Sequence, residues 1–90
     1  MDRDEALELL RSQHAFPGPY RFRAVVRAGE SAGVVTAVSA ATEQVTDVEE
    51  APSRKGTYVS LRVTARVRTA EEVLDVYEVL GRLEQVITTI

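Results

Sequence analysis

The chain has 90 residues, of which 44% are hydrophobic and 28% charged, and its net charge at pH 7 is −3. This balance excludes an intrinsically disordered chain, and the acidic charge argues against a protein built for generic nucleic-acid binding. The absence of cysteine excludes a disulfide scaffold, a thiolate nucleophile and a cysteine-ligated metal site. The N-terminal residues lack the basic flank and apolar stretch of a secretory signal, so we expect a cytoplasmic protein.

The start of the chain predicts a short helix and a proline-rich connection. Leu7 and Leu10 lie among charged residues at helical spacing, which indicates an amphipathic helix over residues 3–13. Two prolines before residue 20 then end any helical pattern. We therefore divide the chain into a lead-in segment, residues 1–19, and a single domain, residues 20–90.

Residues 20–28 predict the first strand, because apolar and polar side chains alternate there with a period of two. Phe22 and Val26 point to one face of this strand and arginines point to the other. A turn follows, and we place Ser31 as the N-cap of a helix. Val34 and Val38 then recur at helical spacing.

Two further strands are joined by an exposed turn. Residues 44–51 alternate and carry acidic side chains, which is typical of an edge strand. The turn at residues 52–56 contains a proline and a glycine. Residues 58–68 alternate strictly between small or aliphatic and polar side chains, so we predict a long central strand.

The end of the chain predicts a helix and a closing strand. Thr69 and Glu72 have the spacing of a capping box, in which the Thr69 hydroxyl and the Glu72 carboxylate each accept a hydrogen bond from the other residue's amide. We expect Gly81 to be the first residue after this helix. Residues 83–90 contain β-branched side chains and predict the fourth strand.

The predicted order is a short N-terminal helix followed by β-α-β-β-α-β, which is the order of the ferredoxin-like split βαβ sandwich. Right-handed crossovers leave few alternative topologies, so we expect a four-stranded antiparallel sheet of order 4-1-3-2 with two helices on one face. The fold class is α+β. The first and third strands are then neighbours at the centre of the sheet.

Three segments resemble a known bacterial family. They are Phe16-Pro-Gly-Pro-Tyr-Arg-Phe-Arg23, Pro52-Ser-Arg-Lys-Gly-Thr-Tyr-Val-Ser60 and Tyr77-Glu-Val-Leu-Gly81. Together they are similar to the YbeD-like family of small domains of unknown function, over nearly the whole chain from residue 16. This resemblance implies a ferredoxin-like fold similar to that of ACT regulatory domains, which bind small ligands and dimerise. It implies no catalytic residues.

The residues themselves do not form a catalytic constellation. Gly29-Glu-Ser-Ala-Gly33 matches the G-x-S-x-G pattern of a nucleophile elbow, but the single histidine, His14, precedes Ser31 instead of following it. His14 also lacks sequence partners of the metal-ligand type. We therefore expect a protein that is not an enzyme, with no catalytic residues, no metal site and no cofactor.

Basic side chains concentrate on one face of the predicted sheet and in one turn. If the apolar residues of the two central strands face the helices, the polar residues between them form an open face. This candidate binding face consists of Arg21, Arg23, Arg27, Tyr58, Arg62, Arg66 and Arg68. A second candidate is an anion-binding loop made of Ser53, Arg54, Lys55 and Gly56. The alternative is that these residues form only a solvated hairpin tip.

The arginines of the open face have three interpretations. In the first, Asp47 and Glu49 pair with Arg62 and Arg66, and the remaining arginines are solvated. In the second, the face docks an acidic protein surface or a second copy of the domain. The third is RNA binding, although RNA recognition by a sheet depends on stacking aromatics and only Tyr58 is offered on this face.

We therefore expect a small regulatory or adaptor domain that binds a protein partner or an anionic small ligand. An RNA-associated module is the alternative. The last strand carries no charged side chain, so its edge predicts a homodimer formed by strand pairing. No stretch approaches the ~20 apolar residues of a membrane span, so no membrane partner is expected.

Overall fold

The computed structural model describes residues 1–90 and contains three helices and four strands. In chain order they are α1 (Arg3–Gln13), β1 (Gly18–Arg27), α2 (Ser31–Ala41), β2 (Gln44–Pro52), β3 (Tyr58–Val67), α3 (Ala70–Arg82) and β4 (Val86–Thr89). None of the three helices combines the length and the apolar composition that crossing a membrane requires.

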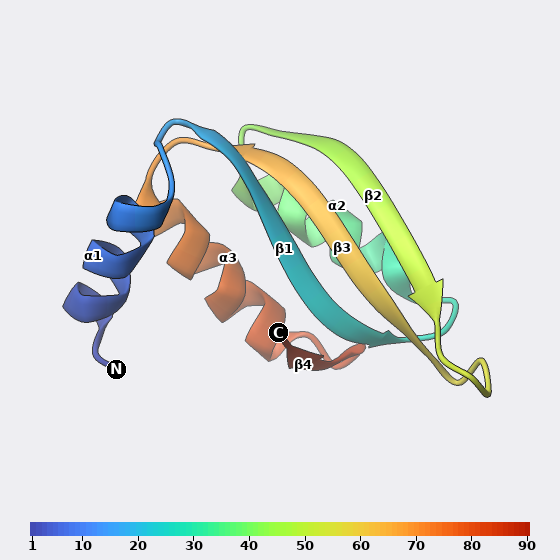
Figure 1. The fold of residues 1–90 in the computed structure, drawn as a ribbon. Coiled ribbons are helices and arrows are strands. Elements are labelled where there is room, and N and C mark those ends of the chain that lie inside the picture. Colours follow the sequence, from blue (N-terminus) through green and yellow to red (C-terminus); the bar gives the residue numbers. More distant parts are fainter.

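The four strands form one antiparallel sheet in the order β2-β3-β1-β4, which confirms the predicted order 4-1-3-2. The helices α2 and α3 lie on one side of this sheet and leave its other face open (Figure 1). The central strands β1 and β3 pair along their whole length, from Gly18 opposite Val67 to Arg27 opposite Tyr58. The α+β ferredoxin-like prediction is therefore confirmed.

The hydrophobic core lies between the sheet and these two helices. The inward positions of β1 and β3 supply Phe22, Val26, Leu61 and Val63, each at most 2% exposed. The helices contribute Val34, Val38, Val73, Val76 and Leu80. Burial of an aliphatic or aromatic side chain stabilises the fold by about 1.5–3 kcal/mol, so the alternating pattern of the central strands accounts for much of the driving force.

The helix α3 begins at a capped turn. Thr69 is its N-cap, and the Thr69 hydroxyl accepts a hydrogen bond from the N–H of Glu72 at 3.1 Å, as the sequence predicts. The Glu72 carboxylate accepts from the N–H of Arg68 at 3.3 Å instead of from that of Thr69. The cap therefore reaches one residue further back than predicted and ties the end of β3 to the helix.

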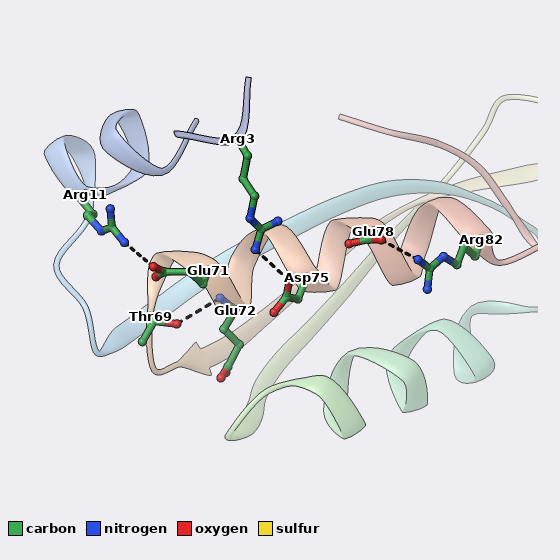
Figure 2. A network of polar contacts seen from close by, with 8 residues as sticks. All are labelled: Arg3, Arg11, Thr69, Glu71, Glu72, Asp75, Glu78 and Arg82. Atoms are coloured by element: carbon green, nitrogen blue, oxygen red, sulfur yellow. Dashed lines mark hydrogen bonds and ion pairs between the residues drawn. The ribbon is translucent and has the colours of Figure 1, made fainter. Parts of the chain in front are cut away.

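The lead-in helix α1 packs against α3. Leu7 is buried, Arg3 pairs with Asp75 at 3.2 Å, and Arg11 pairs with Glu71 (Figure 2). The pKa of the Glu71 carboxyl is lowered, first by a hydrogen bond from its own backbone N–H and then by the Arg11 guanidinium. Two leucines, the buried Leu7 and the half-buried Leu10, and two exposed ion pairs thus attach α1 to the rest of the fold.

Two predicted helix boundaries are wrong. Glu30, not Ser31, is the N-cap of α2, and it forms no side-chain cap hydrogen bond. Gly81 lies inside α3 and not after it. The helix needs no left-handed glycine at its end, because the N–H of Leu83 donates to the carbonyl of Leu80 at 3.2 Å and the chain leaves in an extended conformation.

The strands next to the C-terminal edge also differ from the prediction. β1 begins at Gly18, where a Cβ would lie only 2.8 Å from the carbonyl oxygen of Ala15. A proline has no N–H to donate to a neighbouring strand. Pro19 is tolerated because this part of β1 is an edge, where no neighbouring strand needs that donor. β4 is short and pairs only with residues 24–26 of β1. The first half of β1 therefore has one uncovered edge.

Candidate functional site

The face of the sheet opposite the helices carries the polar side chains of β1 and β3. The register places Arg23 opposite Arg62 and Arg27 opposite Tyr58. Residues that lie opposite each other in a sheet share a face. The structure thus brings six of the proposed residues onto one open face: Arg21, Arg23, Arg27, Tyr58, Arg62 and Arg66.

The β3 arginines of this open face have acidic partners. Arg62 Nη1 lies 3.8 Å from Glu49 Oε2, and Arg66 Nε lies 3.3 Å from Glu43 Oε2. All four side chains are 45–49% exposed, so each pair contributes at most about 1 kcal/mol. The main effect of the pairs is to neutralise the charge along β3.

Asp47 and Arg68 lie outside these pairs. Asp47 is opposite Thr64 and not opposite an arginine, and the register of β2 shifts between Val45 and Asp47. Arg68 follows the last residue of β3, and its Nη1 lies 3.0 Å from Glu72 Oε2 at the start of α3. Arg68 therefore serves the helix cap.

The arginines of β1 have no such partners. Arg21, Arg23 and Arg27 form no ion pair and no side-chain hydrogen bond. Arg23 faces Arg62 across the strands, and Arg21 lies roughly 7 Å from Arg23 along the same face. Like charges opposite each other are destabilising. This half of the open face carries uncompensated positive charge that favours an anionic partner.

The proposed anion-binding loop is the β2–β3 hairpin. The Ser53 hydroxyl accepts a hydrogen bond from the N–H of Tyr58 at 3.2 Å, and the N–H of Gly56 donates to the Ser53 carbonyl at 3.0 Å. Gly56 has a φ of 72°, which favours glycine. Arg54 and Lys55 form no ion pair and are exposed. The loop thus offers basic side chains to an anion, while the Ser53 hydroxyl is used inside the turn.

The G-x-S-x-G segment forms the turn into α2. Gly29 has a φ of 84°, and a Cβ on Gly33 would lie 3.0 Å from the side-chain nitrogen of Gln85. The Ser31 hydroxyl is buried without a hydrogen-bond partner. His14 precedes the opposite end of β1, a ten-residue strand roughly 33 Å long. The segment therefore holds no nucleophile–base pair, and no group of three or more acidic or histidine side chains is arranged to hold a metal ion.

One cluster of side chains that the sequence did not single out lies where β1 runs beyond β4. The ring centroids of His14 and Tyr20 are 5.0 Å apart, and those of Tyr20 and Tyr77 are 6.2 Å apart. A hollow of about 270 Å³, the edge hollow, is lined by His14, Tyr20, Arg21, Arg23, Tyr77 and Ile90. Tyr20 shares the period-two pattern of Phe22, and Tyr77 is spaced like the apolar residues of its helix, so neither position gives a signal that the tyrosine lies near His14.

The environment of Tyr77 keeps its hydroxyl protonated. Burial raises the pKa of Tyr77 above its usual value of 10.0, and the Tyr20 hydroxyl raises it further. The backbone N–H of Arg23 acts in the opposite direction on the same pKa. The neutral form of Tyr77, which any ordinary tyrosine has at physiological pH, is therefore kept to a higher pH than usual.

Comparison with known families covers most of the chain. A family model described as a protein of unknown function, DUF493, matches residues 11–90, which include all four strands, α2 and α3. No curated protein matches the chain. The match confirms that the segments singled out in the sequence belong to a family of unknown function. The chain therefore belongs to the DUF493 family.

Proposed function

We propose that this protein is a non-catalytic binding module whose open sheet face docks an acidic surface of a partner protein. The observation that carries the proposal is a contrast between adjacent strands. The arginines of β3 have acidic partners, whereas Arg21, Arg23 and Arg27 of β1 have none. A guanidinium binds a carboxylate through two parallel hydrogen bonds, so unpaired arginines on an exposed face suit a carboxylate-rich surface.

The charges around β1 also favour one orientation of the partner. Glu49 and Asp47 lie on the open face along β2, opposite residues of β3. An acidic surface is therefore attracted to β1 and repelled from β2. Attraction between exposed charges is screened by salt, so we expect the association to weaken as ionic strength rises.

We extend the proposal to a regulatory or adaptor role in the cytoplasm. A two-layer domain of this size has one face covered by helices and one face free, and it regulates by occupying a surface of its partner. An anionic small ligand on the same arginines would give ACT-like control of that docking. These roles rest on the unpaired arginines of β1 and on the composition of the chain.

RNA is the second candidate, and one observation favours it. Tyr58 is 41% exposed opposite Arg27, and it follows directly on the hairpin that carries Arg54 and Lys55. An exposed aromatic ring flanked by basic side chains is typical of a platform that stacks single-stranded bases. A single ring provides little stacking, and Glu49 lies on the same face, so the protein partner is the leading candidate.

The test is a charge reversal on β1 with a matched control on α3. In Arg23→Glu the new carboxylate faces Arg62, so the sheet is not strained. Arg82→Glu makes the same change of charge on α3, where Arg82 forms an exposed ion pair with Glu78. We expect Arg23→Glu to capture at least about tenfold less of the partner from cell lysate than the native protein does. Arg82→Glu should capture as much as the native protein.

Mass spectrometry of the captured material identifies what is lost. A protein that disappears with Arg23→Glu, remains with Arg82→Glu and dissociates at raised salt supports the proposal. Equal capture by both variants contradicts it. If the lost material is sensitive to ribonuclease, the RNA candidate replaces the protein partner.

We also propose that the outer edge of β4 pairs with a second copy of the chain. β4 carries no charged side chain, and Ile87 within the strand and Ile90 just after it are 47% and 67% exposed. The opposite edge, β2, is protected by acidic residues and by Pro52. Native proteins protect or cover apolar edges, so the bare edge of β4 supports a dimer with a continuous sheet.

A further inference from the structure

The first half of β1 offers backbone groups that no strand uses. The N–H of Ile90 donates to the carbonyl of Arg23 at 3.0 Å, and β4 reaches no further along β1 (Figure 1). Backbone groups alternate in direction along a strand, so the N–H and C=O of Arg21 point to the same edge as those of Arg23. Pro19, next in the alternation, has no N–H. The backbone N–H of Arg21 is therefore a free donor at this edge.

The edge hollow opens beside this donor. Its lining comes from both sides of the sheet, because Arg21 and Arg23 belong to the open face and Tyr77 belongs to α3. No carboxylate side chain lines it. Two arginines without acidic partners and two tyrosines thus line one small space.

These groups are donors of the kind that bind an oxyanion. A guanidinium presents two parallel N–H groups to a carboxylate or phosphate, and a tyrosine hydroxyl adds a third donor. The Tyr77 hydroxyl carries its proton at pH 7, as an ordinary phenol does, and burial raises its pKa further. An anion bound here also offsets the repulsion between Arg23 and the facing Arg62.

We propose that the edge hollow binds the carboxylate or phosphate group of a small molecule. This site adds a small anionic ligand to the proposed function. It rests on that function in one respect, because both need the unpaired arginines of β1. The volume of about 270 Å³ equals that of about nine water molecules at ~30 Å³ each. It admits an oxyanion with a few attached atoms and excludes a folded surface. Occupancy places negative charge beside Arg21 and Arg23, so the small molecule competes with the acidic partner.

Thermal unfolding in the presence of simple anions tests the site. Inorganic phosphate and acetate are compared separately with chloride at pH 7 and equal ionic strength. We expect about 20 mM of the preferred anion to raise the Tm by about 5 °C, because a ligand that binds only the folded state stabilises it. The larger rise identifies phosphate or carboxylate as the group that is bound, and no rise with either anion overturns the proposal.

Nuclear magnetic resonance and three variants locate the effect. The backbone amide signal of Arg21 should shift with the anion, and that of Arg27 should not. Arg21→Gln should weaken binding about tenfold or more, and Tyr77→Phe about fivefold. Arg82→Gln removes an exposed arginine elsewhere and should leave binding unchanged. Undiminished binding in both Arg21→Gln and Tyr77→Phe overturns the assignment.

The two proposals fail in different ways. If no anion stabilises the protein while Arg23→Glu still abolishes capture of the partner, the small-molecule site is absent and the docking face stands. If phosphate or acetate binds at Arg21 while Arg23→Glu leaves capture unchanged, the site stands and the docking face is rejected. Competition is tested directly by adding the bound anion during capture, which should release the partner from the native protein.

Discussion

At the scale of single residues, arginines on neighbouring strands differ because their surroundings differ. Arg62 lies on β3, whose other neighbour β2 supplies Glu49. Arg23 lies on β1, whose other neighbour β4 is short and carries no charge. No carboxylate therefore reaches the β1 side chains, and their charge is not compensated within the domain.

Tyr77 gives a prediction at this scale. Its raised pKa means that the folded protein keeps the proton above pH 10, where the unfolded chain releases it. The free energy of unfolding should therefore fall as pH rises above about 10. Tyr77→Phe lacks this proton and should show a shallower fall. Loss of the hydrogen bond between the hydroxyls of Tyr77 and Tyr20 should cost about 1 kcal/mol at pH 7.

Urea unfolding at several values between pH 9 and pH 11 measures this difference. Tyr58→Phe is the control, because the Tyr58 ring is 41% exposed on the open face. Parallel pH profiles for the native protein and Tyr77→Phe would show that the surroundings of Tyr77 do not favour its neutral form.

At the scale of elements, two kinds of contact attach the peripheral helix α1 to the rest of the fold: exposed ion pairs and a buried leucine. Its ion pairs, Arg3 with Asp75 and Arg11 with Glu71, join side chains that are 45–61% exposed. Leu7 in the same helix is 7% exposed. Exposed ion pairs contribute little, whereas a buried leucine contributes through apolar area and packing. The apolar contact should therefore dominate the attachment.

Single substitutions in α1 test this balance. We expect Leu7→Ala to lower the free energy of unfolding by about 2 kcal/mol, and Arg3→Ala or Arg11→Ala by less than about 1 kcal/mol each. Urea denaturation at low and high salt measures both effects. A larger loss for either arginine than for Leu7 would mean that the ion pairs, and not the leucine, attach the helix.

At the scale of the whole molecule, the sheet has two unlike faces and two unlike edges. Helices cover one face, and arginines occupy the other. One edge, β2, is acidic and ends in Pro52, while the other, β4, is uncharged. The proposed docking of a partner on the open face and the proposed pairing of β4 with a second copy would thus use different parts of the surface.

The dimer prediction belongs to this scale. Because the N–H of Ile90 points to β1, the N–H of Thr89 points outward from the edge. Thr89→Pro removes this outward donor without touching the β1 pairing, and Thr89→Val keeps it. We expect sedimentation at tens of micromolar to give a dimer for the native protein and Thr89→Val, and a monomer for Thr89→Pro. A monomeric native protein would contradict the dimer.

The sequence by itself determined the layers of this fold. The strict alternation of residues 58–68 and the capping pattern of Thr69 and Glu72 are local signals, and each predicted its element. The handedness of crossovers then fixed the strand order. The ends of elements were less predictable, as Ser31 and Gly81 show, because tertiary contacts decide where a helix starts and stops.

Only the tertiary structure decided which arginines form no ion pair and where the edge hollow lies. Ion pairing depends on cross-strand register, which a single irregularity in β2 shifts, so that Asp47 meets Thr64 and Arg66 pairs with Glu43. The edge hollow depends on how far β4 extends along β1, and on α3 bringing Tyr77 to Tyr20. These contacts join residues that are far apart in the chain. The periodicity of the sequence relates only near neighbours, so it does not predict them.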